Sequence, residues 1–224
     1  MQEENIHKFE KPSVTVDMII FTIIDKDLKI LLVRRKFNPF KGKWAIPGGF
    51  VRIDESLEQA VNRELLEETG VKNVYLEQLY TFGDIKRDPR GRVITIAYMA
   101  LINSLELKLK ASTDASDAQW LSVNNVPSLA FDHKKILDYA LKRLRWKFEY
   151  TTVAFSLLPK KFTINKIQTI YEIVFEKKFD KRNFAKKILY LNLLKGEGIK
   201  KDVSHRPPMI YSLKKNIGEI IKII

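Results

Sequence analysis

The sequence predicts an α/β fold in two parts, a larger one built on a mixed sheet and a smaller, basic one. Three observations support this. Residues 13–24 form a continuous β-branched and apolar run, which is typical of a buried strand. Residues 56–69 instead repeat apolar side chains at the spacing of an amphipathic helix. Residues 151–224 carry a net charge of +10, whereas residues 1–150 carry +3, so the two parts differ in composition.

Strands and helices are mixed in residues 1–150, which we assign to the first domain. Ser56 is expected to cap the amphipathic helix, and Gly70 is expected to end it. The paired glycines Gly48 and Gly49 precede this helix and allow the backbone to turn close to a ligand. Further elements are predicted as strands at 28–34, 74–82, 92–102 and 118–121 and as a long helix at 132–148.

Residues 151–224 are expected to form a second, winged-helix-like domain. Thr163 and Asp180 are good N-caps for helices at 164–175 and 181–191. Two short apolar stretches then flank a basic loop at 200–208 and predict a hairpin. Three helices followed by a hairpin is the order of a winged helix-turn-helix, with residues 133–148 supplying the first helix. The boundary between the domains is soft and lies near residues 150–159.

Composition excludes several classes of protein. The chain of 224 residues contains no cysteine, so disulfides and cysteine-based metal sites are excluded. It starts with a polar, acidic segment rather than a signal peptide, and its longest near-continuous apolar run, residues 18–24, is too short to cross a bilayer. We expect a cytoplasmic protein that does not associate with membranes. The basic second domain predicts a polyanionic partner.

Glu64, Glu67 and Glu68 would share one face of the amphipathic helix, because they stand at i, i+3 and i+4. Carboxylates this close repel one another unless a cation lies among them. Mg²⁺ prefers carboxylate oxygens and keeps positions open for water and substrate phosphates. The cluster predicts metal-assisted chemistry on a phosphate compound. The alternative is an ordinary surface helix with a solvated acidic face.

The spacing of residues 49–71 resembles the Nudix box. The matching residues are Gly49, Glu55, Arg63, Glu64, Leu65, Glu67, Glu68, Gly70 and Val71. The resemblance implies an α/β/α sandwich and Mg²⁺-dependent (with Mn²⁺ possible) hydrolysis of a nucleoside diphosphate linked to another group. By carry-over from the family, Glu64, Glu67, Glu68 and the Gly49 carbonyl would bind the metal. Glu64 would bind it or act as the base, and Arg63 would hold the geometry of the cluster.

Arg87, Arg90 and Arg92 surround a predicted turn and are our candidates for binding substrate phosphate or stacking on a base. The alternative is a solvated hairpin tip. The loop and the strand after it, together with residues 129–133, are similar to ADP-ribose pyrophosphatases and their regulatory relatives. This similarity favours ADP-ribose, or another NAD-related or sugar-linked nucleotide, as the ligand.

The helix predicted at 181–191 has the character of a DNA recognition helix, because its first residues are basic or polar. Arg182 and Asn183 suit guanine and adenine edges. The full set of candidate DNA-binding residues is Lys181, Arg182, Asn183, Lys186, Lys187, Lys200, Lys201 and Arg206. The alternative is a helical accessory domain used for dimerisation.

Two functions are compatible with these patterns. The main interpretation is a Mg²⁺-dependent Nudix hydrolase of ADP-ribose or a related compound, with a DNA-binding tail. The alternative resembles Nudix-related transcriptional regulators, in which a Nudix-type domain senses ADP-ribose or a sugar and a winged helix binds operator DNA. A homodimer is expected if DNA is bound, since operators are commonly two-fold symmetric.

Overall fold

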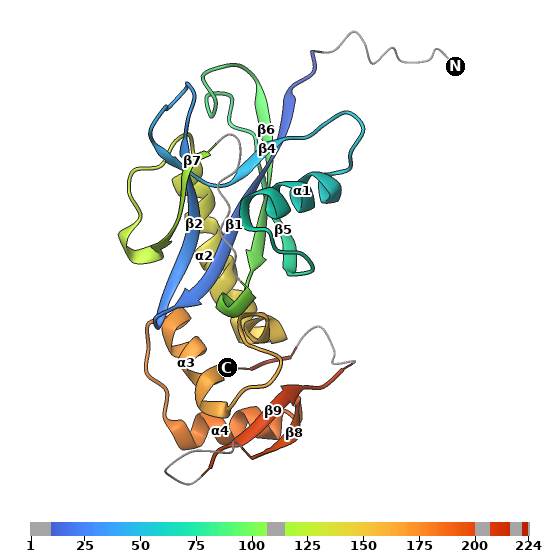
Figure 1. Ribbon diagram of the computed structural model, residues 1–224, viewed down its shortest axis with the longest axis vertical. Coiled ribbons are helices and arrows are strands. Elements are labelled where there is room, and N and C mark those ends of the chain that lie inside the picture. The colour runs from blue at the N-terminus through green and yellow to red at the C-terminus, as the bar shows by residue number, and fades with distance from the viewer. Residues whose placement is uncertain (1–9, 107–114, 200–206, 216–220, 224) are drawn as a thin grey trace, which may run out of the picture.

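The computed structural model describes residues 10–106, 115–199, 207–215 and 221–223 (Figure 1). Its main sheet is mixed, and its central strand β1 (Ser13–Ile24) pairs parallel with β6 (Val93–Leu101) and antiparallel with β2 (Asp27–Arg35). Shorter or outer strands complete it: β3 (Trp44–Ala45), β4 (Gly48–Phe50), β5 (Tyr75–Phe82) and β7 (Ala115–Ser122). Short 3₁₀ turns occur at Ser104–Glu106 and Val123–Asn125.

Helices cover both faces of β1, as predicted for an α/β/α sandwich. Met18 and Ile20 pack with Leu65 of α1 (Leu57–Thr69), whereas Ile19 and Phe21 pack in the cluster that contains α2 (His133–Tyr150). This division follows from the alternation of side chains along a strand. A strand buried on both faces needs an unbroken apolar sequence, which is the run that the sequence shows.

Local capping signals place α1 beside the glycines. Ser56 accepts a hydrogen bond from the Gln59 backbone, and the Gln59 side chain accepts one from the Ser56 backbone. Gly70 ends the helix with φ of 69°, in the left-handed region that glycine adopts without strain. Both predicted caps are confirmed, so the register of the acidic face of α1 is fixed by nearby residues.

The C-terminal part is a winged helix-turn-helix, as predicted. It contains the 3₁₀ turn η4 (Thr152–Leu157), α3 (Ile164–Phe175), α4 (Lys181–Tyr190) and a hairpin of β8 (Leu194–Ile199) and β9 (Met209–Leu213). Thr163 and Asp180 cap α3 and α4. No helix in the described part of the chain is long and apolar enough to cross a membrane.

A single apolar core joins the sandwich to the winged helix. Ile19 and Phe21 of β1, Phe148 of α2, Tyr171 of α3 and Phe184 of α4 belong to one cluster of buried residues. Because α2 begins in the sandwich and ends among the C-terminal helices, it contributes to both parts (Figure 1). The two predicted domains are therefore continuous in packing, although their sequences differ in charge.

Tyr171 offers a test of this junction. Its ring is fully buried, and its hydroxyl donates a hydrogen bond of 3.0 Å to the Phe148 carbonyl at the end of α2. We expect Tyr171→Phe to lower the free energy of unfolding by about 1 kcal/mol, the usual net worth of such a bond. Urea denaturation would measure this loss. Tyr190→Phe is the matched control, because Tyr190 is 86% exposed, and an equal loss in both variants would contradict the expectation.

Candidate functional site

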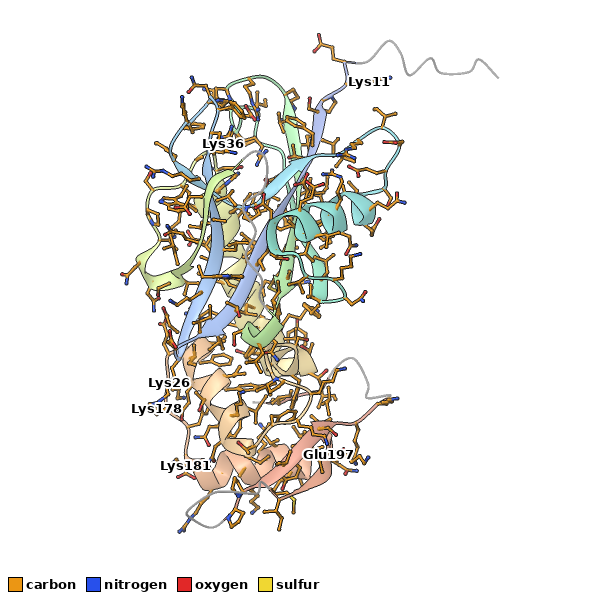
Figure 2. All side chains as sticks on the ribbon, viewed as in Figure 1. Lys11, Lys26, Lys36, Lys178, Lys181 and Glu197 are labelled. Carbon is orange, nitrogen blue, oxygen red and sulfur yellow. The ribbon has the colours of Figure 1, made fainter. Side chains whose placement is uncertain are left out.

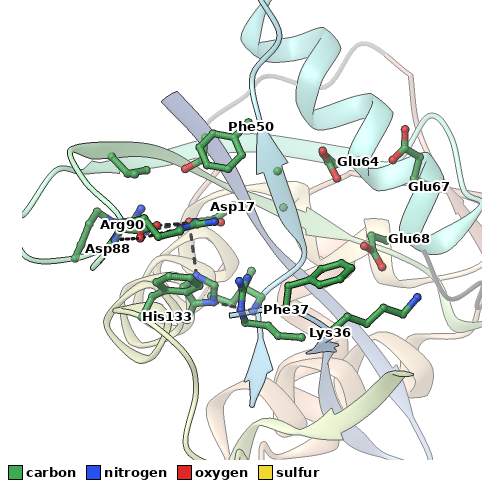
Figure 3. Close-up of a pocket in the computed structure, with 18 of the residues that line it drawn as sticks. Asp17, Lys36, Phe37, Phe50, Glu64, Glu67, Glu68, Asp88, Arg90 and His133 are labelled. Carbon is green, nitrogen blue, oxygen red and sulfur yellow. Dashed lines mark hydrogen bonds and ion pairs between the residues drawn. The ribbon is translucent and has the colours of Figure 1, made fainter. Parts of the chain in front are cut away.

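A cavity of about 520 Å³ lies between α1, β4 and the start of α2, and the loops after β2 and β5 close its sides (Figure 3). The Nudix-box carboxylates line one side. A group of basic, aromatic and histidine side chains lines the other. The cavity therefore brings together the acidic helix and the arginine loop that the sequence singled out.

The acidic side consists of Glu64, Glu67 and Glu68, all of which line the cavity from one face of α1 (Figure 3). Glu64 and Glu68 are buried, whereas Glu67 is exposed enough to meet a ligand in solution. Burial raises the pKa of the Glu64 carboxyl, although hydrogen bonding to Arg63 opposes this effect. Desolvation disfavours the charged form of this carboxyl, and a cation held beside it would offset that effect by favouring the carboxylate.

Arg63 contacts three of the acidic residues through its guanidinium group. Its Nε and Nη2 donate hydrogen bonds of 3.0 and 2.7 Å to Glu55, and its Nη1 donates one of 2.6 Å to Glu64. The same Nη1 lies 3.8 Å from the Glu67 carboxylate. The Arg63 guanidinium lowers the pKa of Glu55 to about 2. One guanidinium thus partly neutralises three carboxylates, which fits the positioning role carried over from the family.

Gly49 lies directly against this cluster. A Cβ atom at Gly49 would come within 2.0 Å of Glu64 Oε1, so only glycine fits while Glu64 keeps its place. Among the described residues, no three Asp, Glu or His side chains are placed to hold a metal ion as they stand. The donor chemistry still fits a hard divalent cation, since the three carboxylates share a face beside the close backbone at Gly49.

Only one of the three candidate substrate-binding arginines presents a partly exposed side chain to the cavity. Arg90 lines it with 43% of its side chain exposed. Arg87 also lines it but is buried, and donates to Asp132 (3.1 and 2.9 Å) and Asp17 (3.2 Å). Arg92 donates to the Gly83 carbonyl at 2.6 Å and is absent from the described lining.

His133 and Asp17 are cavity residues that the sequence interpretation missed. The Ile46 backbone donates a hydrogen bond of 2.9 Å to His133 Nδ1, and burial lowers the pKa of this imidazole. His133 therefore accepts at Nδ1 and is neutral. Asp17 had one available signal, since it is the single charged residue in the apolar run of β1. For His133, the sequence offered no signal apart from the similarity noted for residues 129–133.

The second candidate surface is the outer face of α4. Phe184 and Ile188 are buried, and the remaining face presents exposed polar side chains. These are Lys181, Arg182, Asn183, Lys186 and Lys187. Figure 2 shows Lys181 at the end of the molecule formed by the C-terminal part. Lys200, Lys201 and Arg206 lie outside the described residues.

Comparison with known proteins matches both parts of the chain. Residues 14–142 match the NUDIX domain family, and residues 154–213 match the NrtR DNA-binding winged helix domain. The chain is 36% identical over 207 residues to the ADPR responsive transcriptional repressor NtrR of Acinetobacter baylyi. This alignment covers 91% of the chain and 82% of the repressor.

A relative with a different name aligns only with the first part. The ADP-ribose pyrophosphatase of Methanocaldococcus jannaschii is 47% identical over 137 residues, which cover 61% of this chain and 75% of that enzyme.

A crystal structure of Shewanella oneidensis NrtR complexed with a 27mer DNA superimposes with a TM-score of 0.80 at 37% identity, covering 90% of this chain and 93% of that chain.

Proposed function

Because the chain belongs to the Nudix family and ends in an NrtR-type DNA-binding winged helix, we propose that it is a transcriptional regulator that senses ADP-ribose. The observation that carries the proposal is the alignment of nearly the whole chain, cavity and winged helix together, with a repressor described as ADPR responsive. This favours the regulator over the hydrolase that the sequence interpretation put first. A regulator of this kind acts where the DNA is, which makes a cytoplasmic location part of the proposal.

The winged helix would bind DNA through the exposed face of α4. Lys181, Arg182 and Asn183 lie in its first turn, the part of a recognition helix that reaches base edges. Lys186 and Lys187 lie further along and would meet phosphates, as would Lys200, Lys201 and Arg206. A homodimer would present two such helices to a two-fold symmetric operator.

Ligand control requires that the ligand bind the DNA-competent and DNA-incompetent states unequally. Helix α2 connects the cavity to the winged helix physically. At its start, Asp132 is held by Arg87 beside the cavity. Near its end, Arg145 Nε donates 3.1 Å to the Val174 carbonyl of α3, and Phe148 O accepts from Tyr171. A shift of the cavity loop that carries Arg87 would therefore reach α3 through α2.

DNA binding tests this proposal most directly. We expect the full chain to bind sequences selected from a random DNA library, and ADP-ribose to release them, in a fluorescence anisotropy assay. Affinity should fall steeply with salt, because binding to phosphates releases counterions. Lys186→Ala with Lys187→Ala should lower the slope of log affinity against log salt by about one for each phosphate that the variant no longer binds.

The control for this pair is Lys11→Ala with Lys72→Ala, which removes the same charge from exposed positions in the first part. An equal change in both double variants would show that the effect is net charge rather than a specific surface. Negligible binding by the wild-type chain at low salt would refute the regulator. Binding that ADP-ribose leaves unchanged would refute the sensing role.

Hydrolysis of ADP-ribose is the second candidate function. It is favoured by the complete set of Arg63, Glu64, Glu67 and Glu68 and by the similarity to an ADP-ribose pyrophosphatase. The three glutamates, with the Gly49 carbonyl, would hold Mg²⁺ or Mn²⁺, which neutralises diphosphate oxygens and acidifies bound water. Arg63 would keep the carboxylates in place, and the cavity would hold the diphosphate of the substrate beside them.

Glu67→Gln tests this candidate without disturbing a buried contact. If the chain is a hydrolase, Mg²⁺-dependent release of AMP from ADP-ribose should fall by roughly 100-fold or more, because a metal-binding charge is removed. Glu58→Gln is the control, since Glu58 is exposed on the same helix and absent from the described cavity lining. Equal turnover in wild type and Glu67→Gln would refute the role of Glu67.

A further inference from the structure

The cavity has an aromatic ring at its rim that contributes little to the core. Phe50 stands at the end of β4 and is 48% exposed, and its side chain lines the cavity beside Arg90 (Figure 3). The Arg90 guanidinium carbon lies 5.4 Å from the centre of the Phe50 ring. One side of the ring is therefore covered by a planar cation, and the exposed remainder is available to a ligand.

Arg90 is held rigidly in this position. Its Nε and Nη2 donate hydrogen bonds of 3.0 and 2.7 Å to the two carboxylate oxygens of Asp88, which is buried. This bidentate pair fixes the plane of the guanidinium and leaves its faces for aromatic contacts. The guanidinium carbon also lies 5.7 Å from the centre of the Phe131 ring, so Arg90 contacts two aromatic rings.

Phe131 completes what we call the aromatic stack, which consists of Phe131, Arg90 and Phe50. Its backbone has φ of 51°, a left-handed conformation that is unfavourable for a bulky residue. Such outliers persist where the surroundings impose them, and they gather at ligand sites. The Phe131 ring is fixed further by Phe40 at 4.9 Å and by His133 at 5.2 Å. The aromatic stack is therefore built in advance of any ligand.

We propose that the open side of Phe50 is the platform on which the purine base of a bound nucleotide stacks. This rests on the proposed function, which makes a nucleoside diphosphate the ligand of the cavity. Such a ligand has a diphosphate, whose place with a cation is the acidic side of the cavity, and a flat base that needs an apolar face. A ring polarised by a cation beneath it offers that face, and stacking tolerates any base that presents one.

Phe37 is the competing ring. It also lines the cavity and is 64% exposed, but it lies on the loop after β2, near Lys36 and Glu68 (Figure 3). Phe50 instead belongs to a strand and rests on Arg90, which a buried carboxylate holds in place. Phe50 is therefore the better supported platform, and Phe37 provides a matched control.

Calorimetric titration of the full chain with α,β-methylene ADP-ribose, whose bridge resists hydrolysis, would test the platform in the presence of Mg²⁺. We expect Phe50→Leu to weaken binding about 5- to 100-fold, the range for loss of one base stack. Phe50→Trp should retain binding, and Phe37→Leu should change it less than about 3-fold. Ribose 5-phosphate, which has no base, should bind wild type and Phe50→Leu equally.

The outcomes separate the platform from the proposed function. If the wild-type chain binds the ADP-ribose analogue but Phe50→Leu binds it equally well, the platform is refuted alone. The platform is also refuted alone if Phe37→Leu weakens binding of the analogue more than Phe50→Leu does. It is likewise refuted alone if Phe50→Leu weakens binding of ribose 5-phosphate as much as it weakens binding of the analogue. If the wild-type chain does not bind the analogue, the proposed ligand is refuted and the platform with it.

Discussion

Gly49→Ala is expected to weaken ADP-ribose binding in the presence of Mg²⁺ by roughly 10- to 100-fold while the fold is retained. The new methyl group would lie 2.0 Å from Glu64 Oε1 and 2.7 Å from its Cδ, so the Glu64 carboxylate must leave its place. Leaving also breaks its hydrogen bond to Arg63, and bonds of charged groups are worth about 1.5–3 kcal/mol each. Titration calorimetry would measure the loss, and circular dichroism would verify the fold.

Gly83→Ala is the control for Gly49→Ala. A Cβ atom at Gly83 meets nothing closer than the Ile94 side chain at 3.8 Å, which is an ordinary contact. Both variants add one methyl group to a glycine near the cavity loops, so a difference between them reports the clash with Glu64. Unchanged affinity in Gly49→Ala would mean that the position of Glu64 does not matter for the ligand.

Arg87→Met is expected to lower the free energy of unfolding by about 3–5 kcal/mol, because removing one partner leaves buried charge uncompensated. The side chains of Arg87, Asp17 and Asp132 are 4%, 10% and 10% exposed, and Arg87 bonds to both carboxylates. Chemical denaturation would show the loss as a lower midpoint. Adding Asp132→Asn to Arg87→Met should recover part of it, since one of the two stranded charges is then removed.

Arg90→Met is the comparison for Arg87→Met. Arg90 also pairs with a buried aspartate, but 43% of its side chain is exposed and it holds one carboxylate rather than two, so we expect a smaller loss than for Arg87→Met. The two arginines stand three residues apart in one loop, so a difference in stability between the two variants reports the difference in burial rather than the position in the sequence. If the two variants lost equal stability, the buried cluster around Arg87 would not make the large contribution to the free energy of unfolding that we expect.

The fold was predictable where local signals decide it. The cap at Ser56, the glycine at Gly70 and the apolar run of β1 each act over a few residues, and all are confirmed. The very short strands β3 and β4 were not predicted, because two or three residues show no periodicity and are strands only through their partners. The predicted helix at 132–148 is confirmed and reaches Tyr150.

The sequence indicated the whole acidic side of the cavity, whereas on the opposite side it indicated the arginine loop but neither Asp17 nor His133. Glu64, Glu67 and Glu68 fall within one helical turn, so their spacing in sequence equals their spacing on α1. Arg87 contacts Asp17 and Asp132, which lie 70 and 45 positions away, and no periodicity in the sequence predicts such contacts. The three ligand contacts predicted for the arginines of the charged loop stay a prediction, and the structure places Arg87 among aspartates in the cavity wall and Arg92 against a backbone carbonyl.

The domain boundaries at residues 150 and 151 stay a prediction. The two families match residues 14–142 and 154–213, which leaves the end of α2 between them. That end is where the packing is continuous, since Phe148 lies in the same cluster as Tyr171 and Phe184. The change of charge along the sequence therefore does not coincide with a gap in the apolar core.

Continuity of that core has a consequence for calorimetric melting of the protein. If one apolar cluster must come apart for either half to melt, heating should give one cooperative endotherm rather than two. A nucleotide that binds only the native cavity would then protect α3 and α4 against amide exchange by global opening, although it touches neither helix. The stability of the winged helix would thus report how much of the nucleotide is bound.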